Sequence, residues 1–219
     1  MGKRILLVEG KDDEHVIKHL CKAFDIDKNI FEINSPKENK DAAIEEGGLE
    51  QLLDQIPIRL KESDLERLAV IVDADENIAD RWQQLCYRFK NNIMGIPLPD
   101  VPPKTGTTID LHTDFGPNKL GIWIMPNNEL PGMLESFLAF LVPENDTMMP
   151  RVDSFLNSIP LEERRFRANH HPKARIHCYL AVQKEPGKPL GLSITARYLD
   201  VHSQIVQPFI NWLKDVLID

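Results

Sequence analysis

Two kinds of apolar pattern alternate along the first half of the chain. Residues 4–8 and 68–72 are short, mostly aliphatic runs, which is typical of strands buried in a parallel sheet. Residues 30–34 alternate apolar and polar positions, as a further strand would. Between these runs, apolar residues recur at helical spacing, in two sets: Val16, Ile17, Leu20, Cys21 and Phe24, then Leu49, Leu52, Leu53 and Ile56. This alternation predicts an α/β fold with a parallel, Rossmann-like sheet flanked by helices.

The pattern of the second half predicts a more varied structure. A helical stripe over 78–89 is followed by a short fourth strand at 93–97 and a proline-rich break. Two further strands, at 107–111 and 120–125, are expected to form a β-hairpin inserted at about 98–125. Apolar spacing in the remainder predicts helices only. We therefore expect an α/β core over residues 1–145 and a helical C-terminal extension over 146–219, packed on the same core.

Carboxylates follow the two most strand-like runs. Glu9 and Asp13 come directly after the first, and Asp73 and Asp75 after the second. Ligands of open α/β sheets gather at the carboxyl ends of the strands, and residues i and i+2 of a strand face the same side. Carboxylate oxygens suit hard divalent cations. A site for such a cation is therefore predicted there, although Asp13 and its acidic neighbours could instead only complement the dipole of the following helix.

These segments resemble a known family. The sequences Val8-Glu9-Gly10-Lys11-Asp12-Asp13 and Val72-Asp73-Ala74-Asp75, in this order, are similar to the two acidic motifs of the Toprim domain, which occurs in topoisomerases, primases and OLD-family nucleases. A third segment, around Leu134-Glu135, resembles the helix that follows the Asp-x-Asp strand in OLD-type nucleases. The arrangement is most similar to small stand-alone Toprim-like bacterial proteins. The resemblance implies a Toprim-like fold and adds Glu135 to the expected ligands.

A basic stretch stands out against the acidic composition. The chain of 219 residues has 34 acidic and 26 basic side chains and a net charge of −8, which argues against a general electrostatic grip on nucleic acid. Residues 162–177 nevertheless hold five arginines or lysines and three histidines. They could contact phosphates beside the acidic site, with Lys173 resembling the lysine that follows the Leu-Glu helix in OLD-type nucleases. They could equally form a solvated helix face with ion pairs to Glu162 and Glu163.

Composition restricts the remaining classes. No apolar run is long enough to cross a membrane and the N-terminal residues lack a signal-peptide core, so a cytoplasmic protein is expected. Cys21, Cys86 and Cys178 are far apart and odd in number, which indicates buried thiols rather than disulfides or a zinc site.

Together, the residues and the resemblance predict a metal-dependent nuclease. The expected metal ligands are Glu9, Asp13, Asp73, Asp75 and Glu135, holding Mg²⁺ with Mn²⁺ as a substitute. By resemblance, Glu9 is alternatively the general acid/base and Lys173 stabilises developing negative charge. The expected partner is nucleic acid, with DNA ahead of RNA; a homodimer is left open, and no membrane is involved. The competing hypothesis is a non-catalytic or partner-activated subunit that works with a separate ATPase in defence or DNA repair.

Overall fold

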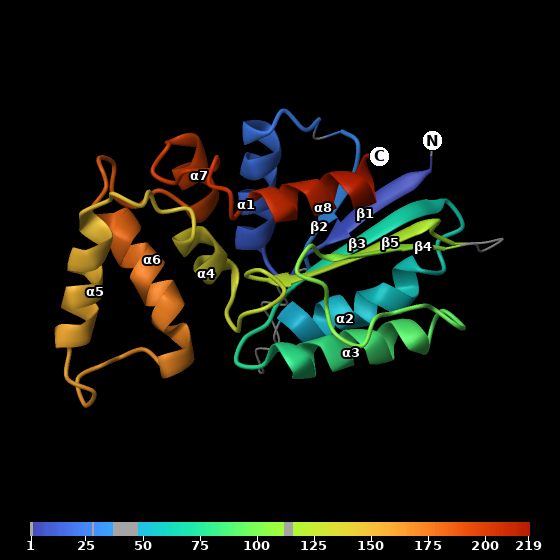
Figure 1. Ribbon diagram of the computed structural model, residues 1–219, viewed down its shortest axis with the longest axis horizontal. Coiled ribbons are helices and arrows are strands. Elements are labelled where there is room, and N and C mark those ends of the chain that lie inside the picture. The colour runs from blue at the N-terminus through green and yellow to red at the C-terminus, as the bar shows by residue number, and fades with distance from the viewer. Residues whose placement is uncertain (1, 28, 37–47, 112–115) are drawn as a thin grey trace.

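A mixed five-stranded sheet forms the centre of the protein. The computed structural model describes residues 2–27, 29–36, 48–111 and 116–219 (Figure 1). The strands lie in the order β2-β1-β3-β5-β4. Their bounds are Lys3–Leu7 for β1, Glu32–Asn34 for β2, Leu65–Asp73 for β3, Thr107–Asp110 for β4 and Lys119–Met125 for β5. All neighbouring pairs are parallel except β4 and β5. The predicted α/β class is thus confirmed, with one antiparallel edge strand.

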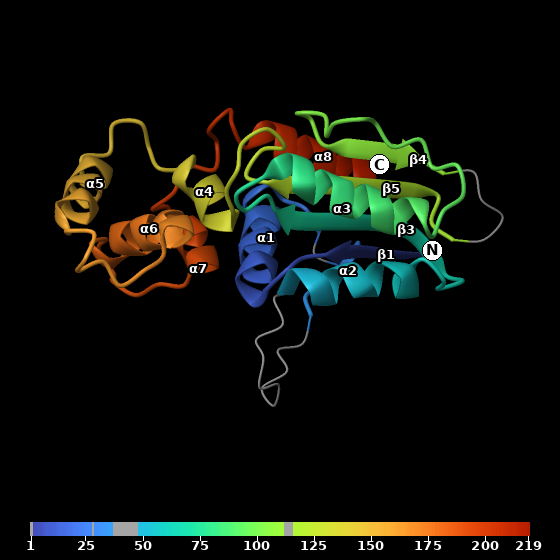
Figure 2. The same cartoon turned by 90° about the horizontal axis from the view of Figure 1, so that it is seen from below.

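Helices cover both faces of the sheet. Helices α1 (Lys11–Ala23) and α8 (Gln207–Leu217) lie on one face, and α2 (Gly48–Arg59) and α3 (Ile78–Lys90) on the other (Figures 1 and 2). The central run of β3 serves both layers. Ala69 and Ile71 belong to the core beneath α1 and α8, whereas Leu68, Val70 and Val72 belong to the core above α2 and α3. Burial on both faces explains why residues 68–72 of this strand are all apolar.

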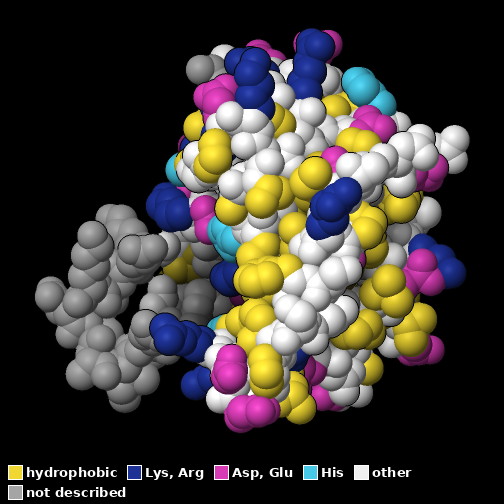
Figure 3. Space-filling model, turned by 90° about the vertical axis from the view of Figure 1, so that its left-hand side faces the viewer, with side chains coloured by type: hydrophobic (Ala, Val, Ile, Leu, Met, Phe, Trp, Pro, Cys, Tyr) yellow, Lys and Arg dark blue, Asp and Glu magenta, His cyan; other side chains and the backbone are white. Residues whose placement is uncertain are grey.

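A group of shorter helices extends beyond the carboxyl ends of the strands (Figure 1). It contains α4 (Leu134–Ala139), α5 (Met148–Ser158), the 3₁₀ turn η1 (Ala168–His170), α6 (His171–Ala181) and α7 (Leu190–Thr195). Buried side chains of α4, α6 and α7 join the same core as α1 and α8. Helix α7 approaches α1 so closely that a Cβ on Gly191 would lie 2.8 Å from the carbonyl oxygen of His15. Figure 3 views this end directly and shows exposed hydrophobic side chains among lysines and arginines.

The hairpin at 107–125 is part of the central sheet. Strands β4 and β5 pair antiparallel, and β5 also pairs with β3 along seven residues, from Arg67↔Lys119 to Asp73↔Met125. Because β5 lies directly beside β3, its carboxyl end reaches the same edge of the sheet as Asp73. None of the helices in the described part of the chain is long and apolar enough to cross a membrane.

The expected strand at 93–97 is wrong. These residues form turns and irregular backbone, with Gly95 at a φ of 70°. Ile93 still donates its N–H to the carbonyl of Phe89 at 2.9 Å, so the chain is leaving α3 rather than entering a strand. Pro97 and Pro99 cannot donate to a sheet ladder. Ile96 is buried against the core of α3, which accounts for the apolar pattern without a strand.

Candidate functional site

Glu9 and Asp13 are held at the turn between β1 and α1. Gly10 precedes the first residue of the helix, and its N–H donates to Oδ2 of Asp13 at 3.1 Å. Oε1 of Glu9 accepts the N–H of Asp73 at 2.7 Å, which joins the ends of β1 and β3 through a carboxylate. The start of α2 fits tightly against this turn: a Cβ on Gly48 would lie only 2.5 Å from the carbonyl oxygen of Glu9. Glycine at position 48 therefore permits the close approach.

Asp73 links the end of β3 to the start of α4. Its Oδ1 accepts the N–H of Leu134 at 3.0 Å, and the next residue, Glu135, is buried with 4% of its surface exposed. A continuous path of hydrogen bonds thus runs from Glu9 through Asp73 to α4. The segments that carry these acids lie far apart in the sequence, and the path brings them together at the carboxyl edge of the sheet.

The four acids Glu9, Asp13, Asp73 and Glu135 form what we term the carboxylate cluster. Burial, opposed by the hydrogen bond from Asp73 and the charge of Arg81, raises the pKa of Glu9 to about 7. Burial and the charge of Glu9 raise the pKa of Asp13 to about 7. The pKa of Asp73 is also well above its usual range, because burial is reinforced by the charges of Glu9, Asp13 and Glu135. The cluster therefore lacks enough positive charge to hold all its members ionised at neutral pH.

Asp75 lies at the margin of the cluster and already has a cationic partner. Its backbone has a φ of 52° and exchanges two hydrogen bonds of 2.8 Å with Gly132. Its carboxylate is about half exposed and pairs with the guanidinium of Arg81. Asp75 therefore contributes charge to the site from its rim.

Arg81 is a site residue that the sequence pattern did not reveal. Only 7% of its surface is exposed, and its Nε donates to the carbonyl oxygen of Asp73 at 2.7 Å. Asn77 caps α3 by accepting the N–H of Ala79 at 2.9 Å, which places Arg81 one turn into the helix, facing back toward β3. The signal available in the sequence was an asparagine typical of a helix N-cap, four residues before the arginine.

Lys173 reaches the cluster from the start of α6. Its Nζ lies 3.3 Å from Oε1 of Glu135, and about half of its side chain is exposed. The structure thus brings together Glu9, Asp13, Asp73 and Glu135, with Asp75 and Lys173 at the margin of the group. Among the described residues, no three Asp, Glu, His or Cys side chains are already arranged so as to hold a metal ion.

The basic stretch does not form the paired helix face that was one alternative. Residues 161–167 form turns and irregular backbone, and α6 begins only at His171. Arg175 is bound by both carboxylate oxygens of Asp153, at 2.5 and 2.9 Å. In the described part of the chain, no ion pair joins the arginines of residues 164–167 to Glu162 or Glu163.

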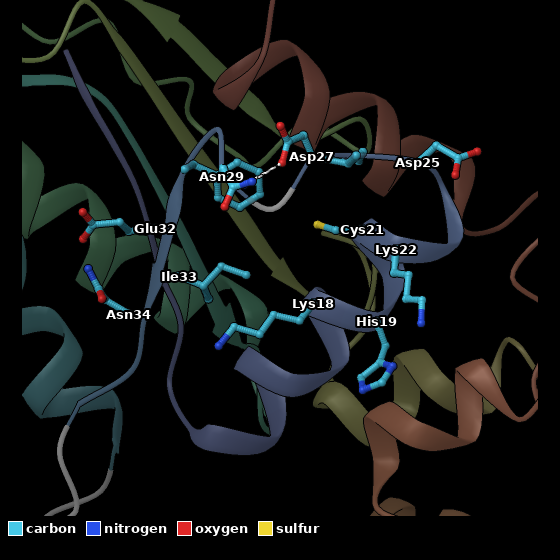
Figure 4. Close-up of a pocket in the computed structure, with 12 residues that line it drawn as sticks. Lys18, His19, Cys21, Lys22, Asp25, Asp27, Asn29, Glu32, Ile33 and Asn34 are labelled. Atoms are coloured by element: carbon cyan, nitrogen blue, oxygen red, sulfur yellow. Dashed lines mark hydrogen bonds between the residues drawn. The ribbon is translucent and has the colours of Figure 1, made fainter. Parts of the chain in front are cut away.

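A cavity of about 790 Å³ lies away from the carboxylate cluster. It is formed by α1, the following turn and β2 (Figure 4). None of the cluster acids lines it. The thiol of Cys21 points into this space, but burial raises the pKa of that thiol to about 11, so it remains protonated at neutral pH. Its lining offers no thiolate nucleophile, and its carboxylates, Asp25, Asp27 and Glu32, are among the described residues that form no group able to hold a metal ion.

The chain belongs to a family described as a protein of unknown function, DUF3226, whose model matches residues 3–218. No curated protein and no solved structure matches the chain. Its function must therefore be inferred from the residues of the site itself.

Proposed function

We propose that the carboxylate cluster is the active site of a Toprim-like, metal-dependent nuclease that hydrolyses phosphodiester bonds in nucleic acid, with DNA ahead of RNA. The observation that carries the proposal is the convergence of four carboxylates with too little compensating charge, at the edge of the sheet where α/β proteins bind ligands. Charge repulsion of this kind is costly in a purely structural cluster. A bound divalent cation would relieve it.

The chemistry of the donors fits Mg²⁺. The cluster offers only carboxylate oxygens, which are the ligands that Mg²⁺ and Mn²⁺ prefer, and no thiolate or imidazole that would favour zinc. The hydrogen bonds from Asp73, Gly10 and Leu134 each use one oxygen of Glu9, Asp13 and Asp73, respectively. The second oxygen of each can serve a cation, together with Glu135 and, from the rim, Asp75. When bound, the cation would supply Lewis-acid stabilisation of charge on the phosphoryl oxygens.

Side chains of the protein would transfer protons, stabilise charge and position the acids. Where Glu9 is not itself a cation ligand, its second oxygen can instead accept a proton from the attacking water and return one to the leaving oxygen. The water oxygen forms the new bond to phosphorus as the bond to the leaving oxygen breaks. Lys173, on the exposed side of Glu135, is placed to stabilise negative charge on the phosphoryl group. Arg81 positions Asp73 and Asp75 rather than contacting substrate.

The direct test is cleavage of plasmid DNA and single-stranded RNA by the purified protein with Mg²⁺ or Mn²⁺. Cleavage should require the metal and be lost in Asp73→Asn, which keeps an oxygen to accept the N–H of Leu134. Asp110→Asn is the matched control, because Asp110 is an exposed aspartate of the edge strand β4. Cleavage that survives a chelator, or that is equal in the two variants, would refute the proposal.

A second candidate is a partner-dependent subunit that acts with a separate ATPase. Two observations favour it. Two of the five acids are already paired with Arg81 and Lys173, and the helical end exposes large apolar side chains such as Phe155 and Leu161. Absence of cleavage by the protein alone, with cleavage restored by an added ATPase partner, would favour this role.

A further inference from the structure

Residues 164–167, which we term the arginine segment, carry positive charge that no carboxylate of the described residues neutralises in an ion pair. The segment contains Arg164, Arg165, Phe166 and Arg167 in a chain with a net charge of −8. Among the described residues, none of the three arginines forms an ion pair with a carboxylate. Most other arginines of the chain have such a partner, as Arg175 has in Asp153. Exposed guanidinium groups without an ion pair are available to bind an anion.

The arginine segment leads directly to the carboxylate cluster. A small pocket of about 210 Å³ is lined by Asp75 and Glu76 after β3, Gly132 and Met133 before α4, and Ala168 and Pro172. Ala168 immediately follows the segment, and Lys173, which contacts Glu135, immediately follows Pro172. One continuous stretch of chain thus runs from the arginines, along the pocket, to the edge of the cluster.

Phe166 anchors the segment and leaves its neighbours exposed. Its ring packs against the main core, lies 6.2 Å from the ring of His171 and carries the guanidinium of Arg164 at 5.4 Å from its centroid. Nε of Arg164 is buried and has no hydrogen-bond partner among the described residues. Arg165 and Arg167, on either side of Phe166, are exposed. The segment therefore has a fixed centre and two free guanidinium groups.

We propose that the arginine segment binds the phosphate backbone of the nucleic acid strand that enters the carboxylate cluster. Arg165 and Arg167 contact phosphates outside the reacting one, and Arg164 supports them from the face of Phe166. Guanidinium groups match phosphate oxygens in geometry and in charge. Contacts of this kind position a strand without reading its sequence. The inference deepens the proposed function and rests on it, because it takes the reacting phosphate to lie at the cluster.

The experiment measures binding separately from cleavage. Fluorescence anisotropy of a labelled single-stranded oligonucleotide, followed against salt concentration in a chelator, reports phosphate binding alone. We compare the wild-type chain, Arg165→Ala/Arg167→Ala, and the control Arg88→Ala/Lys90→Ala, which removes the same charge from α3. Melting curves confirm that all variants are folded. Plasmid cleavage with Mg²⁺ is assayed in parallel.

We expect the Arg165→Ala/Arg167→Ala variant to bind at least tenfold more weakly at low salt. The slope of log K against log salt should be smaller by about 1.4, because each phosphate of a single strand that an arginine neutralises adds about 0.7 to it. The control variant should keep the wild-type slope.

Equal binding by the two double variants, or no binding by the wild type, would overturn the inference. A further arm adds either polyglutamate or unlabelled nucleic acid as a competitor, at equal concentrations of negative charge. If polyglutamate suppresses binding as well as nucleic acid does, the inference is overturned in favour of an acidic protein partner. Binding that depends on the arginines without any cleavage would support the inference while refuting the nuclease.

Discussion

The two edges of the sheet differ in how well their charged side chains are matched by partners of opposite charge. At the amino edge, Arg4 of β1 donates to the carbonyl oxygens of Leu217 and Ile218 at 3.0 and 3.1 Å and to Glu66 at 2.9 Å. Arg67 of β3 and Lys119 of β5 likewise donate to carbonyl oxygens in the last turn of α8. At the carboxyl edge, four carboxylates share too few cations and two of them have a pKa of about 7.

The difference separates stability from function. A helix C-terminus leaves carbonyl groups unsatisfied and carries partial negative charge, so the three cations at the amino edge complete the docking of α8. Among the described residues, no comparable set of cations balances the charge of the carboxylate cluster. In α/β folds the amino edge is free to be optimised for stability, whereas the carboxyl edge must keep room for a ligand. Substitutions at the two edges should therefore differ in kind.

The largest expected effect concerns Glu9. Replacing it with Gln keeps an acceptor for the N–H of Asp73 but removes the proton-transferring group. Under the proposed function, the cleavage rate should fall by roughly 10²–10⁴-fold. The wild-type rate should also change with pH, and this dependence should vanish in Glu9→Gln. An unchanged pH profile would show that another group transfers the proton.

Arg4→Ala should be the most damaging change at the amino edge. It removes three hydrogen bonds and leaves the last carbonyl groups of α8 without their donor. Loss of charged hydrogen bonds at a partly buried site costs about 2–3 kcal/mol. Urea unfolding measures this loss, with Arg88→Ala as a control that removes only the surface ion pairs with Glu50 and Asp54 and should cost less than about 1 kcal/mol. Equal effects of the two substitutions would mean that the cations under α8 contribute no special stability.

Asp73→Asn should raise the stability of the metal-free protein, whereas Arg4→Ala should lower it. Without bound metal, replacing this carboxyl relieves repulsion with Glu9, Asp13 and Glu135, so we expect a gain of about 1–2 kcal/mol near pH 8. The same urea experiment measures the gain. A loss of stability in the metal-free protein would contradict the view that the cluster is strained by uncompensated charge.

The pH dependence of stability should follow the raised pKa values. Glu9 and Asp13 titrate at about 7 in the folded protein, against ordinary values of 4.5 and 3.8, so the folded state binds more protons than the unfolded state between these limits. Stability of the metal-free protein must therefore fall as pH rises through this window. We expect the melting temperature to drop on the order of 5 °C between about pH 5 and pH 8.

A separate acid transition should appear at lower pH. Although burial raises the pKa of Glu14, hydrogen bonds from Lys11, Lys18 and Ser35 outweigh it and lower the pKa to about 2. This carboxyl stabilises the fold above its ordinary pKa, and its contribution is lost as pH falls toward 2. A melting temperature that rises steadily from pH 5 to pH 8 would contradict the assigned directions for Glu9 and Asp13.

Local patterns in the sequence predicted the strands at 4–8 and 68–72, their flanking helices and the acids that follow them. Pattern alone could not order the strands, because the apolar run that became β5 reads the same in an inserted hairpin as beside β3. The apolar pattern at 93–97 also predicted a strand wrongly, because a turn that buries Ile96 after a helix gives the same short apolar run as a strand. Arg81 escaped notice because its contacts with the carbonyl of Asp73 and the carboxylate of Asp75 leave no periodic signal in the sequence. Such contacts depend on where α3 lies, which periodicity does not encode.

The carboxylate cluster is expected above all to bind a cation. Isothermal titration calorimetry with Mn²⁺ near pH 7, in two buffers of different ionisation enthalpy, measures both binding and the protons released. We expect binding by the wild-type protein with release of protons from the cluster, and loss of both in Asp73→Asn but not in Asp110→Asn. Absence of binding, or binding without proton release and equal in all three proteins, would contradict this role of the cluster.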